Sequence, residues 1–208
     1  MRTAETAETI DLHQMTAVVL AGGLSSRMGQ DKRFMLFDGQ VLIQRIVSQL
    51  APFFKEVLIG ANDAGNFAAL NLRVIPDEKP GQGPLMGLVS CLAASRCDVN
   101  FVTACDIPEI DIAFVRALAH ETAGFEAVVP LSAEGRSEPL FAVYRKSVVA
   151  HGRVCLSQGR HRMTDLLEGI RVRYLSMAAA DWYRNLNSRE DYDEALRALG
   201  KGKRSFGA

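Results

Sequence analysis

The sequence predicts an α/β fold in which a mostly parallel sheet lies between two layers of helices. Two observations support this prediction. From Thr16 onward, short continuous apolar runs alternate with longer segments of helical period, and such runs are typical of strands buried on both faces of a parallel sheet. The chain of 208 residues, 48% of them hydrophobic, is long enough to bury the core of one compact domain.

The first half of the chain contains most of the expected parallel strands. The helix expected at residues 41–50 places Leu42, Ile46 and Leu50 on one face. Strands are expected at residues 16–21, 56–61, 72–76 and 100–104, helices at 85–94 and 112–120, and a short amphipathic segment at 66–70. Because right-handed crossovers place such strands side by side, the loops at their carboxyl ends should share one edge of the sheet.

The pattern changes after Gly124, where shorter strands predict an antiparallel edge portion of the sheet in the C-terminal half. Strands are expected at residues 127–130, 140–144 and 172–175, a polar turn at 132–136, and helical segments at 151–158 and 163–167. Ser188, followed by Glu190 and Asp191, is typical of an N-cap with acidic residues in the first helical turn. The final helix should run to about Leu199.

The predicted organisation is one domain at residues 15–200 between a flexible tail at 1–14 and a basic tail at 201–208. The 24 basic and 24 acidic residues cancel, so no overall field should draw the protein onto nucleic acid or an anionic membrane. No apolar run is long enough to cross a bilayer, and the first residues lack the features of a secretory signal. We therefore expect a cytoplasmic protein that holds any bound anion at a local site.

The cysteines and histidines form no recognisable catalytic or zinc-binding pattern. Cys91, Cys97, Cys105 and Cys155 contain no CxxC pair, and the four histidines are scattered. We expect reduced, buried thiols because a chain of this size does not need disulfides. With no activated nucleophile in view, the sequence favours a reaction that needs alignment and charge neutralisation, as phosphoryl-type transfer does.

The loop from Leu20 to Lys32 directly follows the first predicted strand and has the composition of an anion-binding loop. Gly22 and Gly23 would let backbone N–H groups approach a phosphate closely, and Arg27 and Lys32 supply the positive charge that a triphosphate requires. Its spacing matches neither a Walker A motif nor a GxGxxG fingerprint. The alternative interpretation is a surface turn with accidental charges.

A second candidate is Asp106, at the carboxyl end of another apolar strand. A carboxylate in that position can hold a divalent metal against phosphate oxygens. Pro108 should stop the strand and fix the direction of the loop. The alternative is an ordinary helix-capping aspartate.

The segment from Asp77 to Gly87 should line the same edge of the sheet. Gly81 and Gly83 permit a tight backbone pass beside a flat base, and Asp77 can accept from a ribose hydroxyl. Asn62, just after the second strand, offers a donor and an acceptor to a base edge. Each is alone more often a turn residue than a ligand.

Taken together, these motifs resemble those of the molybdenum cofactor guanylyltransferases, a family of nucleotidyltransferases with a Rossmann-like fold. The likeness covers roughly residues 16–199. The motifs that carry it are LAGG at 20–23, RMG at 27–29, DK at 31–32, GPLxG at 83–87, CDxP at 105–108 and NxN at 185–187. The chain departs from the family at Ser188-Arg189, where a Thr-Pro pair is common, and in its longer amino-terminal tail.

The resemblance implies a set of site residues. Nucleotide contacts are implied at Leu20, Ala21, Gly22, Gly23, Lys32, Asn62, Asp77, Gly83 and Asp106, and acceptor contacts at Asn185 and Asn187. Within this set, Lys32 would contact the phosphates and Asp106 the cofactor Mg²⁺. Arg27, which is outside this set, would act with Lys32 to offset charge on the leaving group.

The implied reaction is the transfer of GMP from GTP to the terminal phosphate of molybdopterin, or of the molybdenum cofactor, with release of pyrophosphate. Transient contact with molybdoenzymes or cofactor-delivery proteins is also implied. Two alternatives remain open at this stage. The first is a cytidylyltransferase or sugar-phosphate nucleotidyltransferase on the same scaffold, and the second is a non-catalytic molybdopterin-binding protein.

Overall fold

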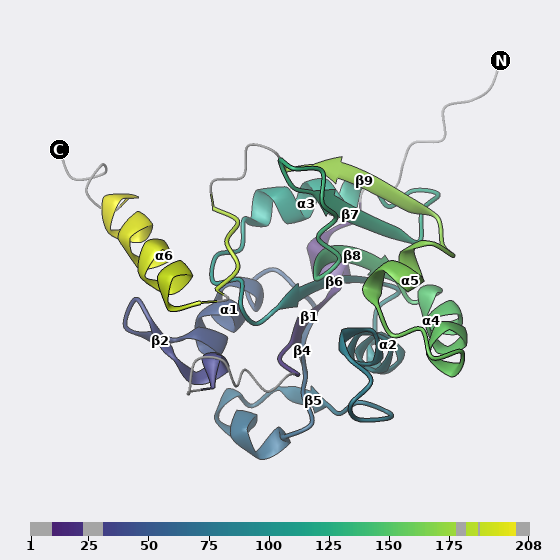
Figure 1. Ribbon diagram of the computed structural model, residues 1–208, viewed down its shortest axis with the longest axis horizontal. Helices are drawn as coiled ribbons and strands as arrows, with labels where there is room; N and C mark the ends of the chain where they lie inside the picture. The colour runs from purple at the N-terminus through teal and green to yellow at the C-terminus, as the bar shows by residue number, and fades with distance from the viewer. Residues whose placement is uncertain (1–9, 23–30, 178–181, 187, 203–208) are drawn as a thin grey trace.

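The computed structural model describes residues 10–22, 31–177, 182–186 and 188–202, without the side chains of Lys32 and residues 199–202. Its centre is a seven-stranded sheet in the order β5-β4-β1-β6-β8-β7-β9 (Figure 1). The strands are β1 (Thr16–Leu20), β4 (Glu56–Gly60), β5 (Arg73–Ile75), β6 (Val99–Ala104), β7 (Ala127–Leu131), β8 (Phe141–Arg145) and β9 (Val172–Ser176). The predicted mostly parallel sheet is therefore confirmed.

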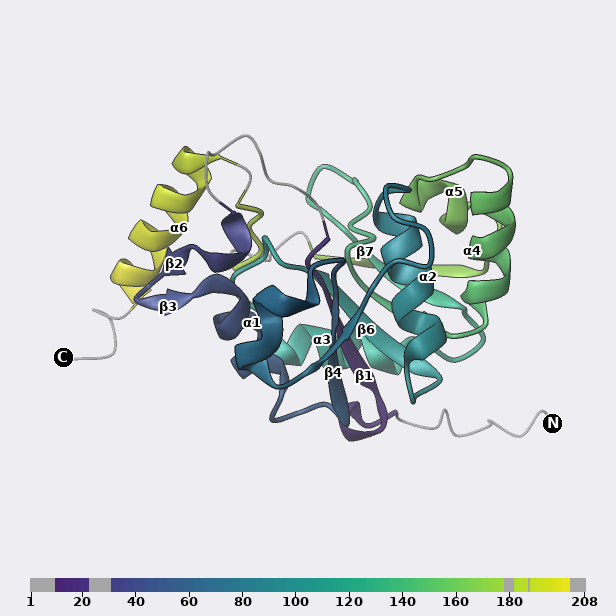
Figure 2. The same ribbon diagram turned by 90° about the horizontal axis from the view of Figure 1, so that it is seen from below.

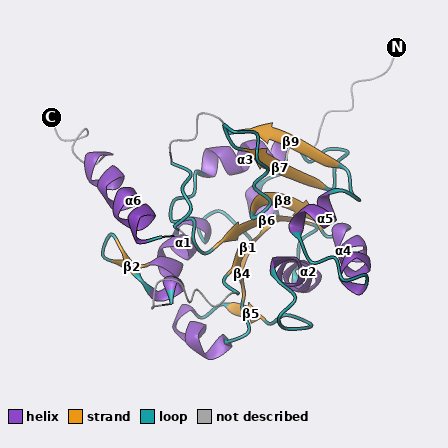
Figure 3. Cartoon of the chain, in the orientation of Figure 1, coloured by secondary structure: helices purple, strands orange, loops and turns teal. Residues whose placement is uncertain are grey.

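Helices cover both faces of this sheet, as Figure 3 shows by colour. The helices are α1 (Leu42–Leu50), α2 (Pro84–Ala94), α3 (Ile112–His120), α4 (Val148–Ser157), α5 (Met163–Leu167) and α6 (Arg189–Gly202). Helices α1 and α3 pack on one face, and α2, α4 and α5 pack on the other (Figure 2). The architecture is a three-layer sandwich, as the sequence predicts.

Alternating residues of β1 show how the sheet serves both layers. Ala17 and Val19 belong to the core beneath α1 and α3, while Val18 and Leu20 belong to the core beneath α2 and α4. Because both faces are buried, the strand reads as a continuous apolar run rather than an alternating one.

The direction of the strands places their carboxyl ends along one edge. Strand β1 pairs in parallel with β4 and β6, and β4 pairs in parallel with β5. In the C-terminal half, β8 is antiparallel to both β6 and β7, whereas the outermost strand β9 runs parallel to β7. The predicted antiparallel portion thus consists of β8, inside the sheet rather than at its rim.

The segment that leads into α6 is held against the sheet by aromatic packing. The ring of Trp182 lies 5.4 Å from that of Phe141 and 5.8 Å from that of Phe114. The ring of Tyr183 lies 5.5 Å from that of Phe141. These contacts fix residues 182–186 beside the carboxyl end of β6, where Leu186 N donates to the Asp106 carbonyl oxygen over 2.8 Å.

Most predicted elements lie within a few residues of the observed ones, and the exceptions are local. The predicted tail at 1–14 is too long, because a 3-10 helix at Leu12–Gln14 buries Leu12 completely, while residues 1–9 lie outside the described chain. The hairpin of β2 (Leu36–Phe37) and β3 (Gln40–Val41) was not predicted. It lies beside α6, where the Phe37 ring contacts Tyr192 at 5.6 Å.

Two predictions about the C-terminal helix can be compared with the structure. The Asp191 N–H donates to the Ser188 hydroxyl over 3.1 Å, and the Ser188 N–H donates to the Asp191 carboxylate over 2.7 Å, so the predicted N-cap is confirmed. Helix α6 continues to Gly202, slightly beyond the predicted end. Among the described residues, no helix is long and apolar enough to span a membrane.

The packing of α4 on α2 generates a first prediction. A Cβ added to Gly152 would lie 2.6 Å from Cγ2 of Val89, a side chain with little freedom to move. We expect Gly152→Ala to lower the free energy of unfolding by about 1–2 kcal/mol, because the overpacking exceeds the gain in helix propensity. Urea unfolding monitored by circular dichroism measures this, and Gly65→Ala, which meets nothing within 4 Å, is the control. Equal stability of the two variants would contradict the prediction.

Candidate active site

A cavity of about 530 Å³ lies at the carboxyl edge of the sheet, between the ends of β4, β1 and β6. The residues that line it are Leu20, Gly22, Gly60, Asn62, Asp77, Gly81, Gly83, Pro84, Gly87, Ala104, Cys105, Asp106 and Leu140. Open parallel sheets bind ligands in this position because the loops that follow the strands converge there.

Backbone hydrogen bonds continue past the ends of the strands and hold the loops together. The Ala21 N–H donates to Gly60 O over 2.8 Å, and the Cys105 N–H donates to Leu20 O over 3.1 Å. On the other side, the Ala61 N–H donates to Ile75 O over 3.1 Å. The floor of the cavity is therefore an extension of the sheet.

The floor of the cavity has no room for a side chain at Gly60. A Cβ at Gly60 would lie 2.8 Å from the Cys91 sulfur and 2.9 Å from Cδ2 of Leu20. The two larger side chains fill the volume below, and the backbone of Gly60 is left to face the cavity.

Asn62 and Asp77 form a reciprocal pair on one wall. The Asn62 amide donates to the Asp77 carboxylate over 2.9 Å, and the Asp77 N–H donates to Oδ1 of Asn62 over 2.8 Å. Each side chain thereby orients the other, so the wall presents amide and carboxylate groups in a fixed arrangement.

The turn before α2 brings a helix amino-terminus to the cavity. Gly83 is the N-cap and has a φ of 75°, in the left-handed region that favours glycine, and Pro84 follows at the first helical turn. Pro84 has no N–H and the Met86 N–H donates to Gly83 O over 3.2 Å. No side chain caps the helix, so the positive end of its dipole faces the cavity, where it favours an anion.

Asp106 lies on the opposite wall, after β6. The same cavity therefore contains Gly22 from the first loop and Asp106 from the loop after β6. Pro108 is buried and its carbonyl oxygen accepts from the Gln49 amide of α1 over 2.9 Å, which fixes the Asp106 loop against the helix layer.

A buried arginine connects the loops behind the cavity. Arg33 is 6% exposed and donates to both oxygens of Asp31 and of Asp63, at distances from 2.5 to 3.0 Å. Its Nη1 also donates to Ala21 O over 2.9 Å. The Arg33 guanidinium holds the pKa of each carboxyl below its ordinary value of 3.8.

This lowered pKa generates a prediction about acid. A carboxyl whose folded-state pKa is depressed stabilises the protein above its unfolded pKa, and this stabilisation is lost as the pH falls through the folded value. We therefore expect the free energy of unfolding to fall more steeply below about pH 3.8 in the wild-type chain than in Arg33→Met. Urea unfolding at a series of pH values measures the difference. If the free energy of unfolding fell equally steeply with pH in both proteins, the prediction would be refuted.

Asn185 lies in a separate pocket of about 300 Å³ beside the cavity. This pocket is lined by Ser132, Ala133, Glu134, Arg136, Glu138, Met177, Tyr183 and Asn185. The Tyr183 hydroxyl donates to Glu138 over 3.0 Å, and burial together with this carboxylate raises the Tyr183 pKa. The predicted acceptor residue Asn185 therefore lies next to the nucleotide-side residues but does not line their cavity.

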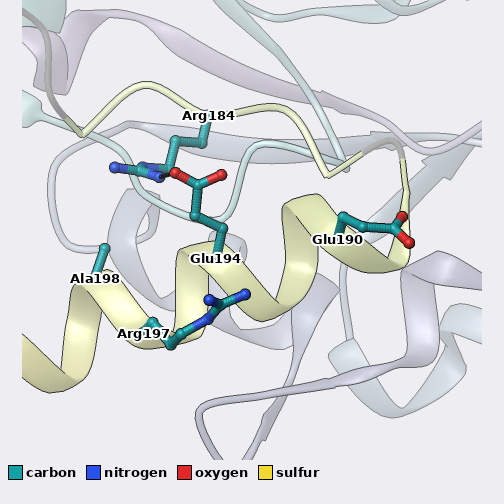
Figure 4. A pocket seen from close by; sticks show the side chains of 5 residues that line it. All are labelled: Arg184, Glu190, Glu194, Arg197 and Ala198. Carbon is teal, nitrogen blue, oxygen red and sulfur yellow. Dashed lines mark hydrogen bonds and ion pairs between the residues drawn. The ribbon is translucent and has the colours of Figure 1, made fainter.

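A third hollow, of about 570 Å³, lies between residue 184 and α6 (Figure 4). Figure 4 shows the Glu194 carboxylate pointing toward Arg184, and the two form an ion pair at 3.1 Å. Its other lining residues are Glu190, Arg197 and Ala198. No residue that the sequence analysis assigned to a site lines this hollow.

The structure brings together most of the described residues that the sequence predicts for the nucleotide side. Those that line the cavity at the sheet edge are Leu20, Gly22, Asn62, Asp77, Gly83 and Asp106. Ala21 is buried behind the cavity, with its carbonyl oxygen on Arg33. Gly23, Arg27 and Asn187 lie outside the described residues, as does the side chain of Lys32.

Sequence reasoning missed two contributors to this region. Leu140, the residue directly before β8, lines the cavity because the fold places β8 next to β6. Arg33 was not singled out, because its partner Asp63 lies 30 positions further along the chain and no motif connects them. The only available signal was a charged residue directly after the Asp-Lys pair.

The donors in the cavity are suited to a magnesium ion held jointly with a ligand. Among the described residues, no group of three histidine, cysteine or acidic side chains could hold a metal on its own. Mg²⁺ is commonly bound by one or two carboxylates together with substrate phosphates, and Asp106 and Asp77 are the carboxylates that line the cavity. The residues present therefore fit this ion.

Comparison with solved structures identifies the fold. The fold matches molybdopterin-guanine dinucleotide biosynthesis protein A from Archaeoglobus fulgidus with a TM-score of 0.78 and 24% identity, covering 90% of this chain and 100% of the other. It also matches 4-diphosphocytidyl-2C-methyl-D-erythritol synthase from Anaerococcus prevotii with a TM-score of 0.70 and 10% identity, covering 91% and 100% of the two chains. The protein has an α/β nucleotidyltransferase fold.

The family follows from the sequence itself. Residues 17–174 match the MobA-like NTP transferase domain, and the chain belongs to this family. A relative in Carboxydothermus hydrogenoformans, described as a probable molybdenum cofactor guanylyltransferase, is 32% identical over 193 residues, which cover 89% of this chain and 97% of the relative. A second, from Chloroflexus aggregans and described in the same words, is 38% identical over 154 residues, covering 72% and 74%.

The cavity thiol generates a prediction about reactivity. Burial raises the pKa of Cys105 to about 12, and the neighbouring Asp106 adds to this effect. Because the thiolate is the reactive form, we expect iodoacetamide at about pH 8 to leave Cys105 unmodified in the folded protein and to label it after unfolding. Peptide mass spectrometry measures the labelling. Rapid labelling of folded protein at Cys105 would show that the thiol is ionised.

Proposed function

We propose that this nucleotidyltransferase transfers GMP from GTP to the terminal phosphate of molybdopterin, or of the molybdenum cofactor, and releases pyrophosphate. The observation that carries the proposal is the convergence of Gly22, Gly83 and Asp106 on one cavity at the carboxyl edge of the sheet. The choice of guanine and of molybdopterin draws support from the relatives described as probable molybdenum cofactor guanylyltransferases.

The cavity offers separate walls to the parts of a nucleotide. The Asn62–Asp77 pair presents hydrogen-bonding groups to the base and ribose. The backbone at Gly22 and the positive dipole end of α2 face the part of the cavity where the phosphates would lie. Lys32, which begins a 3-10 helix directly after the first loop, and Arg27 in that loop would offset the charge that develops on the leaving pyrophosphate.

Asp106 is the residue that would hold Mg²⁺ at the phosphates, and the ion would supply polarisation of the α-phosphate. In the proposed reaction, an oxygen of the acceptor's terminal phosphate forms a bond to the α-phosphorus as the bond to the β-phosphate oxygen breaks. No covalent intermediate with the protein is required. The task of the chain is to align the two substrates and to neutralise charge.

The acceptor would lie on the side of Asn185 and Asn187. The hydrogen bond from Leu186 N to Asp106 O joins this segment directly to the loop that would hold the metal. A substrate held by Asn185 would therefore reach the α-phosphate from the neighbouring pocket. Transfer of the product to molybdoenzymes or to delivery proteins remains part of the same proposal.

The proposal is tested by measuring pyrophosphate release with GTP, Mg²⁺ and isolated molybdenum cofactor. Release that depends on all three supports it. Thermal shifts with GTP against CTP, each with Mg²⁺, identify the preferred base, because selective binding to the native state raises the melting temperature. A larger shift with CTP would contradict the assignment of guanine, and absence of pyrophosphate release with every acceptor would indicate a binding protein.

Substitution of the charged residues gives a further prediction. We expect Lys32→Ala and Asp106→Asn each to slow pyrophosphate release by roughly 10² or more, because each removes electrostatic stabilisation of the transition state. The matched controls are Lys55→Ala and Asp98→Asn, at exposed residues beside the amino ends of β4 and β6. Wild-type rates in Lys32→Ala, with a normal circular dichroism spectrum, would remove that residue from the mechanism.

A further inference from the structure

The hydrogen-bonding capacity of Arg33 is fully used by the protein. A guanidinium has five N–H donors. In Arg33, Nε donates to Asp31, Nη1 donates to Ala21 O and to Asp63, and Nη2 donates to Asp31 and to Asp63. These contacts account for all five donors, so the side chain has none left for a ligand.

The guanidinium also packs against two aromatic rings, whose centroids lie 5.4 Å from each other and therefore on the same side of it. The carbon at its centre lies 5.3 Å from the ring centroid of Phe34 and 5.3 Å from that of Phe67, within the range of cation–π attraction. A buried guanidinium is costly unless it is paired and hydrogen-bonded. Such complete pairing indicates that the position of this side chain is closely determined.

Each partner of Arg33 is the chain neighbour of a residue assigned to the nucleotide. Ala21 directly precedes Gly22, and Asp63 directly follows Asn62. Gly22 and Asn62 both line the cavity at the sheet edge. Asp31 directly precedes Lys32 and also accepts from the Arg33 N–H over 3.1 Å. One side chain therefore connects the loop after β1 at both of its ends with the loop after β4.

We propose that Arg33 is a positioning residue for nucleotide binding, which acts by holding Gly22, Asn62 and Lys32 in a common arrangement without touching the nucleotide. This inference depends on the proposed function, since it assigns a role toward the same site. Losing the connection would leave the loops free to move relative to one another, so nucleotide binding would have to supply the ordering that Arg33 now provides.

The test compares three variants of the full chain with the wild type. In Arg33→Met the packing against Phe34 and Phe67 is largely retained and the charge is lost. In Arg33→Lys the charge is retained, but a single ammonium with three donors cannot link three partners as a planar fork does. Asp63→Asn weakens the link to the loop after β4, because the amide loses the charge and one of the two acceptor oxygens. It also changes the hydrogen bond from Asn66 to Asp63. Isothermal titration with GTP and Mg²⁺ gives the dissociation constant, and pyrophosphate release gives kcat and KM.

A matched control is available at the opposite end of the sheet. Arg145 pairs with Asp98 at 2.7 Å and donates to the carbonyl oxygens of Phe125 and Thr122 over 3.2 and 3.4 Å. It is thus another arginine that links a carboxylate with backbone carbonyls, but beside the amino end of β6. Arg145→Met reports the effect of losing stability without disturbing the cavity.

We expect all three test variants to bind GTP about tenfold or more weakly, with KM raised by a similar factor, while Arg145→Met binds as the wild type does. We also expect Arg33→Met combined with Asp63→Asn to be no weaker than Arg33→Met alone, because both changes break the same link. Should Arg33→Met fail to fold, Arg33→Lys and Asp63→Asn decide the question.

The outcomes separate this inference from the proposed function. If the wild-type chain binds GTP and the folded Arg33 variants bind equally tightly, the positioning role is wrong and the proposed function stands. If Arg33→Lys alone restores wild-type binding, charge rather than the three-way link is what matters, and the inference is overturned. If the wild-type chain binds neither GTP nor CTP, the proposed function fails and this inference fails with it.

Discussion

The parallel pairing of β1 with β4 on one side and β6 on the other is the constraint on which the rest of the structure depends. It fixes three carboxyl ends at one edge, and the bonds from Ala21 to Gly60 and from Cys105 to Leu20 extend the pairing beyond the strands. The cavity lies between the segments that follow β1, β4 and β6 at this edge. The floor of the cavity is therefore continuous with the core beneath it.

The two ends of the sheet have different tasks. At the amino end, Glu56 accepts from the Arg96 N–H, Thr16 and Arg73, and these hydrogen bonds outweigh burial and lower the Glu56 pKa. Such pairing occupies both carboxylate oxygens of Glu56 within the protein and leaves little for a ligand. At the carboxyl end, small residues such as Gly22 and Gly83 keep backbone groups accessible, and the charged side chains gather behind or beside the opening.

The sequence was sufficient where the signal was local and insufficient where the fold made the connection. Asp106 could be predicted because it directly follows an apolar run, and Gly83 because it opens a helix after a glycine-rich turn. The β2–β3 hairpin was missed because its strands have only two residues each, too few for any periodicity to appear. Arg33 and Leu140 were missed for another reason, since their roles come from neighbours distant in sequence.

The position of Asn185 shows how the fold forms two neighbouring pockets without a second domain. The segment at residues 182–186 does not belong to the sheet, yet Trp182 and Tyr183 hold it through rings that contact Phe141 of β8. Because β8 runs antiparallel to β6, the residues before its start, including Glu138 and Leu140, lie at the carboxyl edge. Glu138 lines the Asn185 pocket, and Leu140 lines the cavity at the sheet edge. The segment that leads into the one reversed strand of the described sheet thus contributes a residue to each pocket, and both pockets lie at the same edge.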